Sequence, residues 1–247
     1  MLTLLVALGC AAPDVVLADE AASGPTLVGV TWALAWRLGA VRVDEGGLTL
    51  SREDGELRVS EGSLGDVGLS LIPCETPDTG LARLSPIRAA YAGHGATLDS
   101  STWSAGLVEQ LTSPETIVLG AASFDPTRYC GAHYAVAPAG ASWEGAREEA
   151  TGKTLRLVGG LDGAAHGVLA ETSYAHGALI DLLPAAKGLD PSQAHDLTIT
   201  VTRDLEATLM ALPQDADPQD ADPQDAAWSA LGQMMDAVSV TLTPTVE

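Results

Sequence analysis

The segment Asp196 to Thr202 alternates apolar and polar residues and is the clearest strand signal in the chain. Leu197, Ile199 and Val201 fall on one face of an extended strand, and the threonines between them fall on the other face. A strand with one apolar face is stable only where a sheet carries it and another layer covers that face. The pattern therefore predicts a layered fold that is rich in β-structure.

Further strand signals recur along the chain, separated by glycine or aspartate–glycine turns. The other runs predicted as strands are 26–35, 48–50, 56–59, 67–74, 83–92, 116–119, 129–136, 153–158, 168–173 and 239–243. Many short strands at this spacing predict an all-β fold, a β-sandwich of immunoglobulin-like or related type with a few short helical insertions. We expect one such domain over residues 26–247.

Three segments are predicted to contain helix. Residues 99–111 combine a loop with a short helix, and residues 178–186 form a second one. Residues 226–237 are expected to form an amphipathic helix, because apolar side chains recur there at helical spacing. Those side chains are Trp228, Leu231, Met235 and Val238. Aromatic residues make up only 4% of the chain, so all five tryptophans are expected to serve as large packing units of an aliphatic core.

The first ten residues are apolar, too few to span a bilayer, and end at Cys10. The run Ala7-Leu8-Gly9-Cys10 resembles the lipobox of bacterial lipoproteins. This resemblance implies that residues 1–10 are a signal whose Cys10 carries the lipid anchor. It also implies a cell-envelope protein at the outer membrane, because no aspartate follows Cys10 directly. A plain secretory signal is the alternative. Residues 11–25 are small, acidic and contain proline and glycine, as in a flexible tether.

The chain has three cysteines. If Cys10 carries a lipid, Cys74 and Cys130 remain, and an oxidising compartment would join them in a disulfide. Closing that loop would stabilise the fold by about 4 kcal/mol in the chain-entropy description. The alternative is that both thiolates bind a soft metal ion such as copper.

Rare residues are concentrated in Tyr129 to Tyr134, where strand alternation places Cys130 and Tyr134 on one face and His133 on the other. His94 lies between two glycines inside the loop that the disulfide would close. The two imidazoles could therefore converge on a copper, zinc or nickel ion. The alternative is that both are ordinary histidines. The remaining three histidines, His166, His176 and His195, are expected at the surface.

The formal net charge is −21, with an isoelectric point near 4.3. Such a chain repels nucleic acid and anionic membrane surfaces and attracts cations. We interpret the charge as a solubility feature, with dedicated cation binding as the alternative. Residues 213–226 repeat Gln-Asp-Ala-Asp-Pro and are predicted to form a disordered acidic loop, because proline recurs every five residues. The glycine and final glutamate of a calcium-binding EF-hand loop are missing there.

Motifs for catalysis are missing from the sequence. It contains no Gly-x-Ser-x-Gly elbow, no Ser-x-x-Lys and no Gly-x-Gly-x-x-Gly fingerprint. Nucleophile, acid and base do not group in any recognisable spacing. We therefore predict that the protein is not an enzyme.

Three patterns together resemble the β-sandwich family of methanobactin-associated periplasmic copper-binding proteins and their uncharacterised relatives. They are Tyr129 to Tyr134 after a turn, the Lys153 to Val158 strand, and Asp196 to Thr202 followed by Leu205 and Leu209. This resemblance implies copper handling. Our prediction is a non-catalytic cell-envelope lipoprotein that binds an unknown protein or small ligand. The alternative is a periplasmic copper-handling protein that uses His133 and His94.

Overall fold

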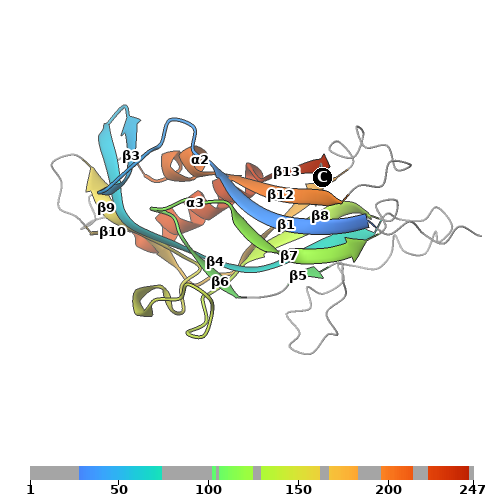
Figure 1. Cartoon of the computed structure of the whole chain (residues 1–247). Coiled ribbons are helices and arrows are strands. Elements are labelled where there is room, and N and C mark those ends of the chain that lie inside the picture. The colour runs from blue at the N-terminus through green and yellow to red at the C-terminus, as the bar shows by residue number, and fades with distance from the viewer. Residues whose placement is uncertain are drawn as a thin grey trace, which may run out of the picture.

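The structure, a computed structural model, describes residues 28–73, 102–103, 106–124, 129–161, 167–182, 196–213 and 222–244. Within these residues, strands form one sheet of four and one of nine (Figure 1). The helices are the 3-10 helix η2 (Glu148–Ala150), α2 (Leu205–Met210) and α3 (Pro223–Asp236). The predicted all-β class with a few short helices is confirmed.

The smaller sheet has the strand order β13-β12-β1-β7. Its strands are β1 (Val28–Arg37), β7 (Ile117–Phe124), β12 (Leu197–Asp204) and β13 (Ser239–Pro244). The two central strands, β1 and β12, run parallel, whereas β7 and β13 pair antiparallel at the edges. The parallel pair distinguishes this sheet from the antiparallel sheets of immunoglobulin domains.

The larger sheet is organised around β4, a strand of 19 residues from Gly55 to Pro73. Its other strands are β2 (Arg42–Asp44), β3 (Gly47–Arg52), β5 (Thr102–Trp103), β6 (Leu107–Gln110), β8 (Tyr129–Val136), β9 (Leu155–Leu161), β10 (Gly167–Thr172) and β11 (His176–Asp181). The sequence predicted two strands, 56–59 and 67–74, where β4 is continuous. Register shifts after Val59 and Asp66 let one long strand bend and change partners without ending.

Two helix predictions are wrong. In the segment 99–111, β5 and β6 are strands that pair with β4, and residues 176–181 form strand β11, which pairs with β8. In both places an open sheet edge supplies backbone hydrogen-bond partners. Such tertiary pairing outweighs a weak local preference for helix. Residues 183–195 lie outside the described part of the chain.

Helix α3 begins at Pro223, inside the segment 213–226 that was predicted to be a disordered loop. The side chain of Asp222 accepts a hydrogen bond from the backbone N–H of Gln224 at 2.9 Å. Proline is favourable in the first helical turn, where its missing N–H has no intrahelical partner in any case. The last acidic repeat therefore starts a helix. Residues 214–221 are not described.

A single large core joins the two sheets and the two α-helices. In Figure 1 the smaller sheet lies over the larger one, and α2 and α3 lie beside the smaller sheet. Helix α3 packs on β10 and β11 and against α2. Small residues on its buried face, Ala226, Ala227 and Ala230, allow this close approach. The fold thus buries the inner faces of β1 and β12 against β4 and β8.

Candidate functional site

The inward face of β12 ends in a charged residue. Leu197, Ile199 and Val201 are buried, and the alternation continues to Arg203, which is 0% exposed. In the parallel pair, Arg203 lies opposite Trp36 of β1. Its guanidinium carbon lies 4.3 Å from the centre of the Trp36 ring, so the cation rests on the indole face.

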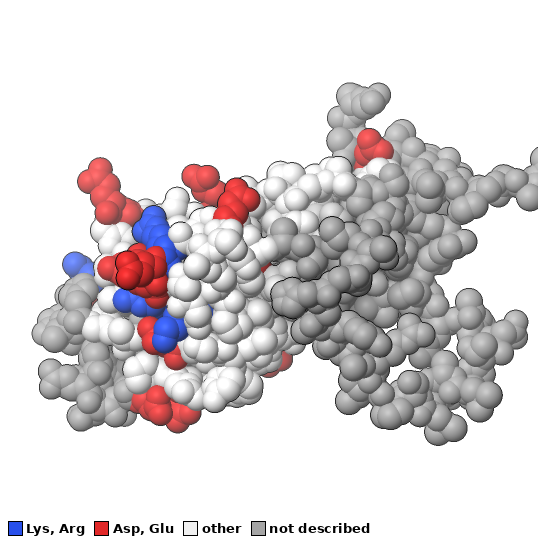
Figure 2. Space-filling model, turned by 90° about the horizontal axis from the view of Figure 1, so that it is seen from below, with Lys and Arg blue, Asp and Glu red and all other residues white. Residues whose placement is uncertain are grey.

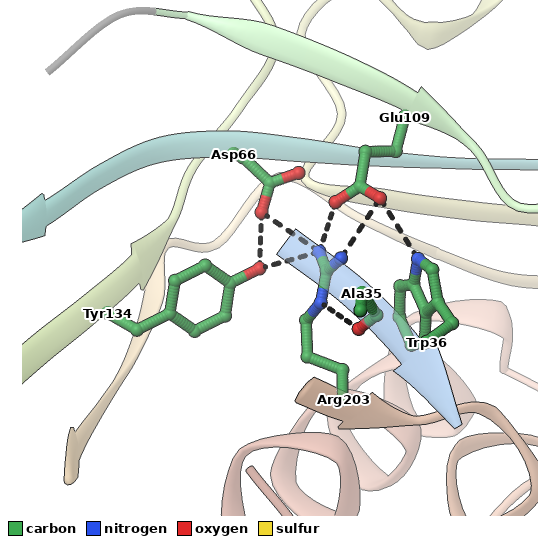
Figure 3. A network of polar contacts seen from close by, with 6 residues as sticks. All are labelled: Ala35, Trp36, Asp66, Glu109, Tyr134 and Arg203. Atoms are coloured by element: carbon green, nitrogen blue, oxygen red, sulfur yellow. Dashed lines mark hydrogen bonds and ion pairs between the residues drawn. The ribbon is translucent and has the colours of Figure 1, made fainter. Parts of the chain in front are cut away.

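Three polar side chains of the larger sheet meet this guanidinium, as Figure 3 shows. Glu109 of β6 accepts hydrogen bonds from both terminal nitrogens of Arg203, with a distance of 3.1 Å from Nη2 to Oε2. Tyr134 of β8 donates its hydroxyl proton to Asp66 of β4. Nη1 of Arg203 lies 3.4 Å from Oδ1 of Asp66 and 3.2 Å from the Tyr134 hydroxyl.

The indole of Trp36 completes this group, which we call the Arg203 network: Trp36, Asp66, Glu109, Tyr134 and Arg203. Nε1 of Trp36 donates to Oε2 of Glu109 at 2.9 Å. The network joins both strands of the parallel pair to three strands of the opposite sheet. Apart from the partly buried Trp36, its members are 0 to 3% exposed.

The two carboxyl groups of the network differ in protonation. Burial raises the pKa of Asp66 well above its ordinary value, and the negative charge of Glu109 raises it further. Burial would also raise the pKa of Glu109, but the adjacent Arg203 charge and hydrogen bonds lower it on balance. Asp66 is therefore the neutral acid, and Glu109 is the carboxylate that neutralises Arg203.

The surroundings of Asp66 favour the same assignment. Its Oδ2 is buried and has no hydrogen-bond partner among the described residues. A buried oxygen without a donor is more costly in a carboxylate than in a neutral carboxyl group. The Arg203 network thus holds one cation, one anion and one neutral acid.

This arrangement can connect the sheets, but it cannot contact a substrate. A general acid or base must lie within hydrogen-bond distance of the reacting group. The ionised members of the Arg203 network are buried, Arg203 fully and Glu109 to within 3%. Removing one partner from a buried ion pair costs about 3–5 kcal/mol, whereas the intact pair adds little over apolar packing. Loss of any one partner is therefore expected to destabilise the packing of the two sheets.

The sequence pointed to His133, and the structure places it on the outer face of the larger sheet. Ala132 and Tyr134 are buried in the core, so the predicted alternation along β8 is confirmed. His133 is half-buried between Ser70 of β4 and Leu179 of β11. Among the residues that the structure describes, no group of three or more metal-binding side chains is found. His94 lies outside them.

The predicted disulfide has one partner, Cys74, outside the described residues. β4 ends at Pro73, directly before Cys74, and Pro73 is paired with Tyr129, directly before Cys130. The predicted link would therefore fasten two neighbouring strands, and it stays a prediction. Counting free thiols in denaturant without reductant tests it. The lipid-anchor residue Cys10 also lies outside the described part.

Trp228 corrects the expectation that every tryptophan packs in the core. Its side chain is 52% exposed, because the buried face of α3 runs through Ala227, Leu231 and Met234. Two aromatic side chains meet it at the surface. The ring of Tyr174 lies 6.3 Å from the Trp228 ring at 87°, and that of His176 lies 5.2 Å away at 40°. We call these three residues the aromatic cluster.

Charged residues gather at the end of the molecule near β3 and β9, where Figure 2 shows both signs intermixed. A groove of about 750 Å³ over the hairpin of β2, β3 and β4 lies there. Both arginines that line it, Arg42 and Arg58, form ion pairs with Glu56 at 2.8 Å. The groove therefore offers no excess of one charge to a ligand.

The alternation of buried and outward-facing residues in β12 continues to Arg203, but the strand predicted from the sequence ended one residue before it. The strand prediction closed at Thr202, and one more step of the alternation places Arg203 inward with Val201. Asp66 had no such signal, because alternation from Val67, Leu69 and Leu71 places it on the opposite face. The register shift between Asp66 and Gly68 turns it inward beside Leu69 and Leu71. Glu109 lay in a segment expected to contain helix, so its inward position could not be deduced.

Comparison of this chain with protein-family models, with curated proteins and with solved structures finds no match. In the described part of the chain, both α-helices are too short to be membrane-spanning segments.

Proposed function

We propose that this protein is a non-catalytic lipoprotein of the bacterial cell envelope that binds a partner. Cys10 would carry the lipid, and the folded domain would stand away from the outer membrane on residues 11–25. One observation supports a binding role over catalysis. The carboxyl group whose pKa is raised well above its ordinary value, that of Asp66, is buried in the Arg203 network, whereas the exposed aromatic side chains form a surface cluster.

Lipid attachment is tested by metabolic labelling with radioactive palmitate in a bacterial host. We expect the full chain to be labelled and to sediment with the outer membrane, and Cys10→Ala to lose both properties. A matched Cys130→Ala variant should keep label and location. An unlabelled full chain, or a Cys10→Ala variant that keeps its label, contradicts the anchor.

The copper alternative is separated from this proposal by titrating the full chain, in detergent, with Cu²⁺ and Zn²⁺. If His133→Ala and His94→Ala leave metal uptake unchanged, these residues do not form a metal site. A loss of uptake in both variants, but not in His176→Ala, would favour the copper-handling function instead.

A further inference from the structure

The aromatic cluster presents two exposed rings at nearly a right angle. Tyr174 is 57% exposed and Trp228 is 52% exposed. One helical turn after Trp228, on the same side of α3, lies Gly232. A β-carbon built at Gly232 would meet no atom within 4 Å. No described side chain therefore fills the space over the helix at Gly232, one turn beyond Trp228.

The helix that carries Trp228 has only negative formal charges. Asp222 at the N-cap, Asp225 and Asp236 are acidic, and the helix has no lysine, arginine or histidine. Asp225 precedes Trp228 by three residues and so lies on the same side of the helix. The chain as a whole has a net charge of −21. Both the local and the overall charge attract a cation to this surface.

The third ring of the cluster belongs to His176, at the start of β11. The backbone N–H of Gly177 donates to Nδ1 of His176 at 3.0 Å. The ring of His176 lies 5.2 Å from that of Trp228 and adds a third aromatic surface to the cluster.

In the core of the same molecule an arginine already lies on the face of an indole. Arg203 lies 4.3 Å from the centre of the Trp36 ring, with carboxylates beside it. The two cation–π contacts within the described residues both involve Arg203, so none is made there by Trp228. A guanidinium is planar and weakly hydrated, and it stacks on aromatic rings better than an ammonium group does. Trp228 beside Asp225 offers the same two components at the surface.

From this combination we infer that the aromatic cluster is a docking site for an arginine side chain of a basic partner protein. The guanidinium would stack on the exposed indole of Trp228, with Asp225 on the preceding helical turn supplying the opposite charge. This inference deepens the proposed binding function and rests on it.

The probe is a fluorescent pentapeptide with the sequence Gly-Arg-Gly-Arg-Gly, titrated with the full chain in detergent at physiological salt. Two matched peptides carry lysine or the uncharged arginine analogue citrulline in place of both arginines. We expect the arginine peptide to bind most tightly, the lysine peptide less tightly and the citrulline peptide least. Equal binding of the arginine and citrulline peptides would show apolar stacking without cation recognition, and it would overturn the inference.

The variant Trp228→Leu should weaken arginine-peptide binding by about threefold or more, the range expected for an exposed cation–π contact. Leu179→Ala is the control, because Leu179 is 79% exposed yet lies outside the cluster. Asp225→Asn should weaken binding more than Glu53→Gln, which removes the same charge at the hairpin between β3 and β4. Circular dichroism checks that each variant is folded.

Wild-type affinity in Trp228→Leu, or equal effects of the two charge variants, would mean that the peptide binds only through overall charge, and either result overturns the inference. Neither result affects palmitate labelling or membrane fractionation. Failure of this site is therefore distinguishable from failure of the proposed lipoprotein function.

Discussion

Trp36 and Trp228 have the same side chain in opposite surroundings. Trp36 lies at the end of β1, where it contacts the guanidinium of Arg203 and donates to Glu109. Trp228 lies on α3 with half of its surface in solvent and with two other aromatic rings beside it. The indole of Trp36 has a partner from its own chain. The indole of Trp228 is accessible to another molecule.

The two sites differ in local dielectric, and therefore in how strongly a charge interacts with its partners. Charges in the Arg203 network have lost their water, so each depends on its partners. A cation on Trp228 would keep most of its hydration and would be screened by salt. Substitutions in the Arg203 network should therefore change stability, whereas those in the aromatic cluster should change binding.

The largest effect is expected for Arg203→Met, which leaves the Glu109 carboxylate buried without its cation. We expect a loss of about 3–5 kcal/mol in the free energy of unfolding, measured by urea denaturation. Arg37→Met is the matched control, since Arg37 pairs with Asp204 but is 62% exposed in its side chain. That variant should cost about 1 kcal/mol or less. Similar losses in both variants would contradict the contrast between core and surface.

The next effect is a pH dependence that comes from Asp66. Its pKa is raised in the folded state, so its contribution to stability is complete below about pH 3.9 and is lost as the pH rises toward the raised value. The lowered pKa of Glu109 acts in the opposite sense, because that contribution is lost as the pH falls below about 4.3.

Above about pH 5, where Glu109 is ionised in both states, Asp66 determines the slope. Stability should then decrease with rising pH by at most about 1.4 kcal/mol per unit. Urea unfolding at a series of pH values measures this slope. In Asp66→Asn, which has no proton to lose, the slope should disappear. A variant with an unchanged slope would show that Asp66 is not the neutral acid of the network.

The smallest effect on stability is expected for Trp228→Leu. An exposed substitution away from the core should change the free energy of unfolding by about 0.5 kcal/mol or less. Trp36→Leu should cost more, because it removes a hydrogen bond to the charged Glu109 as well as the indole face under Arg203. Thermal unfolding of both variants compares them directly. If Trp228→Leu proves the more destabilising, the aromatic cluster is a structural element of the fold.

The strands could be predicted from the sequence largely because alternation and turn residues are local. The run from Leu197 to Val201 is buried on one face as expected, and His133 faces away from the core as expected. Strands β6 and β11 could not be found in this way. Each is short, and its conformation is set by pairing with β4 or β8, which are distant in sequence.

The two sites were harder to predict than the strands, for different reasons. Arg203 requires that an alternation continue onto a charged residue, and its burial makes sense only once Glu109 and Asp66 come from the opposite sheet. Trp228 has the helical spacing of a core residue. Its exposure depends on α3 turning the alanine side toward the sheet, which local spacing does not determine.

The parallel pairing of β1 with β12 also determines when the protein can finish folding. Each β1 residue from Val30 to Arg37 is paired with a residue of β12, so two segments 167 residues apart in sequence must meet. Closing so long a loop is slow compared with forming a hairpin. During synthesis, β1 lacks its central neighbour until β12 has emerged. A chain cut short before β12 therefore cannot assemble the complete smaller sheet.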